Sequence, residues 1–447
     1  MSIGKILAAG CLCLIAASDL SAQNTPSVLT LRECVETALK NNPDVKKAGF
    51  ESERDLINLR GAKGAMLPSL NASVYHYLRQ GRNIDNATNQ YINSSNTTAS
   101  VNAEGDLTLF NGFRLFNNLK ANQLNAEAGR MEIQQAKDLL VLNVILSYLD
   151  VLSSSDVLKQ SEAQAAVTEK QVSRLAIQNE QGAIKPSEFY DVKGQLSGNK
   201  VAIINAKNAL NNARLKLAQL MNTTYNESLT VEPVNLEQFE ISSTAGADSI
   251  YQIALDQLAM IKSVDLSLKS FDKSVQSAKG GLWPTLSLVG GYNTNFSKVQ
   301  KDADNKSIPY FDQLKNNRGT YAGIGLNIPL MNGFRTRNQL SMARVAKREA
   351  EFQSESIRIQ LRQNIERDYL NMTATLSRYQ VLTEQVASYS ENFRAAEVQF
   401  ENGAINSVDY LIAKNKLDFA NIDLIIARYE YVLRKRIIDY YQGRLSW

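Results

Sequence analysis

The sequence predicts a mixed α+β membrane chain built from two tandem copies of one helix–strand–strand–helix unit. Three features of its 447 residues predict this fold class. Short motifs recur at nearly constant spacing, and two regions alternate apolar and polar residues with the period of a β-strand. Two further segments are long enough and sufficiently free of Gly and Pro to form very long helices.

The internal repeat is carried by three motifs. Residues 62–70 match residues 278–286, with Pro68 and Pro284 separated by 284 − 68 = 216 positions. Two later motifs recur at an offset of 221: Asn111-Gly112 as Asn332-Gly333, which are predicted to be strand–helix turns, and Gly182-Ala183-Ile184 as Gly403-Ala404-Ile405. The additional residues therefore enter between the first and second motifs, where an exposed loop tolerates insertion.

These matches divide the chain into three parts after its first residues. Repeat 1 is predicted at 23–222, a linker without clear period at 223–247, and repeat 2 at 248–447. We expect the linker to pack outside the helical bundle.

Residues 1–22 have the composition of a secretory signal peptide. Lys5 precedes an apolar stretch at 6–17, and cleavage is expected near Ala22. A lipoprotein cleavage box ending at Cys11 is the alternative, although the apolar region before it is short for a signal core. Without the signal only Cys34 remains, which excludes an intrachain disulfide. No later run of about 18 apolar residues is found, so any membrane span is expected to be β.

Each copy begins with helices. Thr30 and Glu33 have the spacing of a capping box. Asn42-Pro43 is expected to end one helix and begin the next, because proline is accommodated in a first helical turn.

A β-hairpin is predicted in each copy, at about 68–110 and 284–331, where the apolar period changes to two. In the first hairpin, apolar residues from Val101 to Leu109 alternate with four polar residues that would line a lumen: Asn102, Glu104, Asp106 and Thr108. In the second, Ala322, Ile324, Leu326, Ile328 and Leu330 form one apolar face. The connections at 80–95 and 298–317 are rich in Asn, Asp and Ser, which predicts exposed loops.

The remaining segments are helical. Residues 336–402 contain no Gly or Pro, enough for a helix of about 100 Å, and residues 114–181 are their counterpart. Apolar residues from Leu382 to Phe400 step by four and three, as in a coiled-coil seam. Shorter return helices are expected at 186–222 and 407–442, stacked with the opening helices beside the long ones.

Four strands of about ten residues can cross a bilayer at a tilt but cannot close on themselves. Because open strand edges are not tolerated in lipid, we expect oligomerisation, and a trimer with twelve strands is the smallest arrangement that leaves a pore. The alternative is a soluble sandwich of the two hairpins. Aromatic residues near the strand ends favour the barrel: Tyr75, Tyr77, Trp283, Tyr292 and Phe296.

Taken together, the motifs resemble the TolC family of outer-membrane efflux proteins. The resemblance is carried by residues 29–33 and 38–43, and by both copies of the Pro-x-Leu, Asn-Gly-Phe-Arg and Gly-Ala-Ile motifs. It implies a homotrimer whose twelve-stranded barrel in the outer-membrane lipid continues into a periplasmic α-helical coiled-coil barrel. It further implies a passive exit duct of a tripartite efflux or type I secretion system. A periplasmic adaptor, the membrane fusion protein, would join it to an inner-membrane RND, ABC or MFS pump.

The resemblance places the gate and the adaptor contacts at the tip of the tunnel, around Gly182, Ala183, Ile184, Gly403, Ala404 and Ile405. Glu188 and Asp409 each lie six residues after a tip glycine. They either stabilise a helix dipole or, repeated in a trimer, form a ring of like charge that favours cations. A family arginine is replaced by Ile405 and a second family acid by Ile412, so we expect a more apolar or adaptor-dependent closure.

Other classes of protein fit less well. His76 is the only histidine, and no metal-ligand cluster, phosphate loop or nucleophile elbow is present, so neither catalysis nor a metal or cofactor is expected. A net charge of +4 is too balanced to indicate nucleic acid. A periplasmic coiled-coil adaptor or scaffold is the alternative function, but it does not account for four amphipathic strands. A free-standing porin has no use for the long helices. The exported substrate and the pump class are open.

Overall fold

The computed structural model describes residues 28–84, 89–93, 95–234 and 246–445. The predicted signal peptide at 1–22 and the centre of the linker lie outside the described residues. The helices are α1 Leu31–Asn41, α2 Pro43–Gly64, α3 Arg114–Glu180, α4 Pro186–Met221, α5 Ala247–Gln257, α6 Ala259–Gly280, α7 Tyr310–Asn316, α8 Arg335–Glu401 and α9 Ser407–Tyr441. The strands are β1 Val28–Leu29, β2 Ser69–Arg79, β3 Arg82–Ile84, β4 Tyr91–Asn93, β5 Asn96–Phe110, β6 Thr230–Val231, β7 Thr285–Ser297 and β8 Gly319–Asn327.

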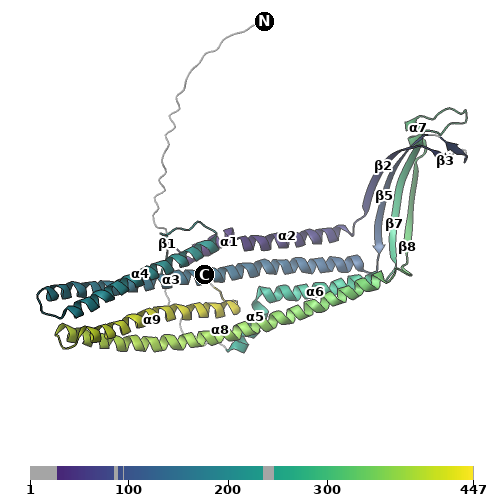
Figure 1. Ribbon diagram of the computed structural model, residues 1–447. Helices are drawn as coiled ribbons and strands as arrows, with labels where there is room; N and C mark the ends of the chain where they lie inside the picture. Colours follow the sequence, from purple (N-terminus) through teal and green to yellow (C-terminus); the bar gives the residue numbers. More distant parts are fainter. Residues whose placement is uncertain (1–27, 85–88, 94, 235–245, 446–447) are drawn as a thin grey trace, which may run out of the picture.

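The molecule is elongated, with a curved sheet at one end and two helical turns at the other (Figure 1). α3 and α8 run along the length of the helical part. α4 covers the tip half of α3 and α2 the other half, while α9 and α6 do the same for α8. The prediction that short helices stack beside the long ones is confirmed.

The sheet has the order β2-β5-β7-β8, and every neighbouring pair is antiparallel. Cross-strand partners separate its two faces. On one face Leu70, Gly105, Gly290 and Ala322 lie side by side, and on the other Ser73, Asn102 and Asn293 do. The predicted apolar face therefore extends across all four strands, and the polar face across β2, β5 and β7.

Two details of the strands differ from the prediction. The register shifts between Thr108 and Phe110, so that Phe110, not Leu109, lies opposite Leu286. Such a bulge inserts one unpaired residue and bends the strand. The alternation of apolar and polar residues in the sequence does not indicate it. β8 ends at Asn327, so Ile328 and Leu330 lie beyond the strand.

The two connections at the far end of the sheet are not simple loops. β3 pairs with β4 in the first, and α7 forms in the second. Gln313 of α7 is 1% exposed and hydrogen-bonds through its side chain to both the N–H and the C=O of Ser297. Tyr310 packs against His76 and Phe296. A buried amide that satisfies backbone groups gives no periodic signal in the sequence.

The predicted helix starts are present. The Thr30 N–H donates to Glu33 and the Glu33 N–H donates to Thr30 Oγ, which completes the capping box and lowers the pKa of the Glu33 carboxyl. Asn42 ends α1 and accepts from the Asp44 N–H at the start of α2. In the predicted coiled-coil seam, Leu382 and Phe400 are buried.

The main core lies in the middle of the bundle, where α1, α3, α4, α5, α6, α8 and α9 meet. One described helix, α3, is long and apolar enough to cross a membrane by length and composition, which the sequence prediction did not allow for. More than half of that stretch is buried, and Val144, Ile145 and Tyr148 of α3 are core residues. Its apolar character is accounted for by protein packing.

The described part of the linker is more ordered than expected. β6 pairs in parallel with β1, and the Tyr148 hydroxyl donates to Leu29 and Glu232 carbonyls beside this pair. Leu229 is buried in the main core. The linker therefore contributes to the bundle rather than only covering it.

Candidate functional site: the tip of the helical hairpins

The two turns at the tip have the same backbone geometry. Gly182 and Gly403 have φ of +68° and +70°. In each turn the following N–H donates back into the long helix, from Ala183 to Gln178 O and from Ala404 to Gln399 O, both at 2.8 Å. This is a Schellman motif, which needs a left-handed residue after the helix end. Glycine adopts that conformation without the steric cost of a Cβ atom.

The return helices start in two different ways. α4 begins with Pro186, whereas α9 begins after Asn406, whose side chain accepts from the Asp409 N–H at 2.9 Å. Glu188 and Asp409 lie in the first turns of these helices. Their position fits stabilisation of the helix dipole.

An apolar tip cluster fills the space behind the two turns. It consists of Leu175, Val192, Phe400 and Tyr410. Ile184 and Ile405 pack against it, one from each turn. Tyr410 stacks on Phe400 with ring centroids 4.6 Å apart, and burial raises the pKa of its hydroxyl to about 12. The turn residues are thus fixed by apolar packing.

Two polar contacts join the hairpins near the turns, and sequence reasoning missed both. Arg174 of α3 and Glu401 of α8 form an ion pair at 2.6 Å. The Ser407 hydroxyl donates to Asp191 of α4 at 3.1 Å. The partners lie more than 200 residues apart in sequence, so no local pattern could indicate them.

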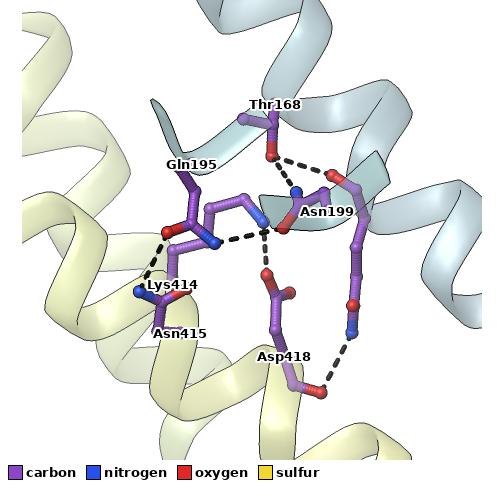
Figure 2. A network of polar contacts seen from close by, with 7 residues as sticks. Thr168, Gln195, Asn199, Lys414, Asn415 and Asp418 are labelled. Carbon is purple, nitrogen blue, oxygen red and sulfur yellow. Dashed lines mark hydrogen bonds and ion pairs between the residues drawn. The ribbon is translucent and has the colours of Figure 1, made fainter. Parts of the chain in front are cut away.

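A buried polar layer lies above the tip cluster, and it too was missed. It consists of four buried residues, Gln164, Thr168, Asn199 and Lys414, and three half-buried ones, Gln195, Asn415 and Asp418. Figure 2 shows α9 residues meeting α4 residues across the gap between the hairpins. Asn415 donates to Gln195 at 3.4 Å, and Gln164 of α3 donates to the Asp418 carbonyl at 2.9 Å. Lys414 is 2% exposed and its ammonium is paired with the Asp418 carboxylate. Burial raises the pKa of Asp418, against the hydrogen bond from Lys414.

The predicted lumen residues share one face of β5. Asn102, Glu104 and Asp106 lie opposite Ser73, Asn71 and Ser69 of β2, and the Ser69 hydroxyl is hydrogen-bonded to Asp106. Thr108 lies opposite Ser287 of β7. The structure therefore brings all four residues onto the polar face.

The strand–helix turns lie where the sheet meets the helices. Gly112 and Gly333 have positive φ, and so do Phe113 and Phe334 after them. Asn111 is buried and accepts from the Leu115 N–H at 3.3 Å, and Asn332 donates to Thr336 at 2.5 Å. Gly112 packs directly on Gly280 of the second copy, where a Cβ on Gly280 would lie 2.5 Å from Gly112 O. The sequence indicated the turns but not this contact.

An amphipathic sheet continued by two long helical hairpins defines a class of membrane channel chains. The family model described as "Outer membrane efflux protein" matches residues 34–223 and 250–436. The chain belongs to this family. It is therefore an outer-membrane efflux channel protein, a member of a family of transport proteins rather than of enzymes.

Named relatives agree with this assignment. The chain is 23% identical to outer membrane protein TolC of Salmonella enteritidis over 416 residues, covering 93% of this chain and 82% of TolC. It is 22% identical to outer membrane efflux protein BepC of Brucella suis, covering 93% and 86%. The CmeC outer membrane channel of Campylobacter jejuni has the same fold, with a TM-score of 0.79 at 17% identity over 93% of this chain and 86% of CmeC.

Proposed function

We propose that three copies of the chain form the exit duct of a tripartite efflux or type I secretion system. Each protomer contributes its four strands to a twelve-stranded barrel and its two helical hairpins to a periplasmic tunnel. The two tandem repeats, 23–222 and 248–447, each supply one hairpin of each kind, and 223–247 links them. The duct conducts passively, and an inner-membrane pump acts through a periplasmic adaptor.

The observation that carries this proposal is the four-stranded sheet with two free edges. β2 and β8 each have a strand neighbour on one side only among the described residues. A membrane sheet with such edges needs partners, and four strands are too few to close a barrel. Pairing β8 of one protomer with β2 of the next closes the sheet and places Glu104 and Asp106 in the lumen.

The tip turns support the part of the proposal that concerns the periplasmic adaptor. Ile184 and Ile405 are held by the tip cluster directly beside the exposed turns. In this proposal the turns, Gly182-Ala183-Ile184 and Gly403-Ala404-Ile405, form the adaptor contact, and Glu188 and Asp409 recur around the axis at the entrance. Apolar contacts between protomers at Ile405 close the entrance in place of an ion pair.

The substitution Ile405→Ala tests this closure. It should raise conductance and change drug susceptibility. If both conductance and drug susceptibility stayed unchanged, apolar closure would be contradicted.

A pair of adjacent substitutions tests the barrel. Val74 lies on the apolar face of β2 and is 70% exposed, whereas Ser73 lies on the polar face. Val74→Arg places a charge in lipid, at a cost of about 2–4 kcal/mol near the membrane centre. We expect loss of heat-modifiable trimers from the outer membrane. Ser73→Arg should assemble normally and lower cation conductance in planar bilayers. Equal assembly of both variants would contradict a membrane barrel.

A further inference from the structure

We propose that the buried polar layer is a register lock, which fixes α9 against α3 and α4 and so sets the relative height of the two tip turns. Lys414 is a positioning residue for the gate, acting through Asp418. The lock is a property of a single protomer. Only its effect on conductance rests on the proposed function.

The layer is one helical turn thick. Each of the three helices contributes a pair spaced i and i+4: Gln164 and Thr168 from α3, Gln195 and Asn199 from α4, Lys414 and Asp418 from α9, which also contributes Asn415. Residues at this spacing lie on the same helix face, one above the other. Hydrogen bonds run from Gln195 to Asn199 at 3.1 Å and on to Thr168 at 2.8 Å (Figure 2).

The layer interrupts the apolar core in all three helices. In α3, Leu158 packs on the main core and Val172 on the tip cluster, with the layer residues between them. In α4 the layer lies between Val192 and Leu210, and in α9 it lies between Leu411 and Ile425. The tip cluster is therefore separated from the main core by stretches in which the three helices bury only small apolar residues beside the polar ones: Ala165, Ala206, Ala413 and Ala420.

Register is the property that such a layer can fix. An apolar seam repeats along the helices, so a shift by one turn replaces one apolar contact with another. The polar groups that bond between helices have no such freedom, because after a shift Asn415 would lose Gln195 and the Asp418 carbonyl would lose Gln164. Lys414 and Asp418 both belong to α9, so the pair moves with the helix, and a shift by one turn toward the tip would place it against the tip cluster. The ion pair itself gives little net stability, since desolvation of both groups offsets their attraction.

The contacts nearer the turns do not fix the register. Arg174 and Glu401 are 34% and 49% exposed, and exposed ion pairs are weak. The Ser407–Asp191 hydrogen bond is a single contact between helix starts. The layer lies about 15–25 Å above the turns at 1.5 Å per residue and joins the hairpins through several buried polar side chains, whereas Ser407, 2% exposed, makes one bond nearer the gate. The tip can then open below it while α9 keeps its alignment.

The test replaces the ion pair with apolar residues of similar size, Lys414→Met with Asp418→Leu. The other hydrogen bonds of the layer remain possible, because Gln164 donates to the Asp418 main-chain carbonyl. Two disulfide reporters measure register in the purified protein. Asp191→Cys with Ser407→Cys reports the register of the structure. Asp191→Cys with Leu411→Cys reports a shift of one turn.

We expect the apolar double variant to form trimers and to keep its unfolding temperature. The ratio of shifted to native disulfide should rise about tenfold, as expected when a polar residue that specifies register is removed, and conductance should increase. Lys414→Met alone, which leaves the Asp418 carboxylate buried without a counter-charge, should destabilise the protein. Gln195→Leu with Asn415→Leu, a milder variant that removes the Asn415–Gln195 hydrogen bond between α9 and α4, should shift the same ratio in the same direction.

Three results would overturn the lock. An unchanged disulfide ratio in both double variants would show that apolar packing alone sets the register. Failure of the Lys414→Met, Asp418→Leu protein to form trimers would show that the pair acts through stability. A matched control removes an ion pair remote from the tip, Arg358→Met with Asp265→Leu between α8 and α6. An equal shift of the tip disulfides in that control would exclude a specific role for the layer.

Discussion

α3 and α8 are each 67 residues long and occupy equivalent places in their hairpins, yet their surroundings differ. α3 is packed between α2, α4, α6 and α9. α8 contacts α5, α6 and α9 and exposes large apolar side chains along its length, among them Phe352, Leu370 and Val381. Equivalent segments of a repeated sequence thus take the same local structure, while their position in the bundle decides what they bury. The exposed stripe of α8 fits the proposed contact between protomers.

The largest difference is expected in the cores of the two helices. Ile145 of α3 is 1% exposed in the main core. Ile145→Ala removes buried methyl groups and leaves a cavity, so the free energy of unfolding should fall by about 2–5 kcal/mol. Urea unfolding followed by circular dichroism measures this change.

Leu370 of α8 provides the matched control, since it is 65% exposed. Leu370→Ala should leave the urea unfolding of the protomer nearly unchanged and reduce the fraction of SDS-resistant trimer. A loss of protomer stability equal to that of Ile145→Ala would show that the two helices do not differ in burial.

The two tip turns should respond alike, although their hairpins differ. A Cβ atom at Gly182 or Gly403 would meet no neighbouring atom, so a substitution changes only the backbone energy. Gly182→Ala and Gly403→Ala should each cost about 1–2 kcal/mol, the penalty of a left-handed residue with a side chain. Gly194, inside α4 and equally unobstructed, is the control. Gly194→Ala should stabilise the protein by about 1 kcal/mol, and thermal unfolding distinguishes the signs.

The stability contributed by two acidic residues, one in α3 and one that contacts α8, should depend on pH in opposite directions. Burial raises the pKa of Asp138 in α3, whereas a hydrogen bond from Lys347 of α8 lowers the pKa of Asp272 in α6. The stability contributed by Asp138 is therefore present below its unfolded pKa and is lost as pH rises through its folded pKa. That of Asp272 is present above an unfolded pKa of about 3.8 and is lost as pH falls through its folded pKa.

Substitution by asparagine checks both signs. The difference in stability between Asp138→Asn and the natural protein should favour the variant more at pH 7 than at pH 4. Asp272→Asn should be less stable at pH 7, with the difference shrinking as pH falls below 4. Unfolding temperatures measured across pH 3–8 would contradict this assignment if both variants shifted in the same direction.

The smallest effect is expected at the contact between α3 and α8. Arg174→Gln removes a partly exposed ion pair, which should cost less than about 1 kcal/mol and depend on salt. Conductance measured at low and high salt tests whether the ion pair restrains the tip. Equal conductance of the variant and the natural protein at both salt concentrations would show that it does not.

Local signals predicted the fold, whereas contacts between distant segments were not predictable. The capping box at Thr30, the helix break at Pro43 and the alternation around Glu104 each depend on neighbours within a few residues. The layer around Lys414 depends on three helices whose alignment no single segment encodes. A lysine among apolar residues of a return helix was the one available signal, and it is equally consistent with an exposed position.

The contact between Gly112 and Gly280 determines how stiffly the sheet is joined to the helices. The two backbones touch without a side chain between them, so neither can slide past the other unless the turn itself unfolds. From this point α3 extends for about 100 Å, which makes it a lever with its pivot at the sheet. A rotation of about one degree at the pivot displaces the far end by about 2 Å over that length. The joint must therefore be tight, because any looseness there would be magnified at the tip turns.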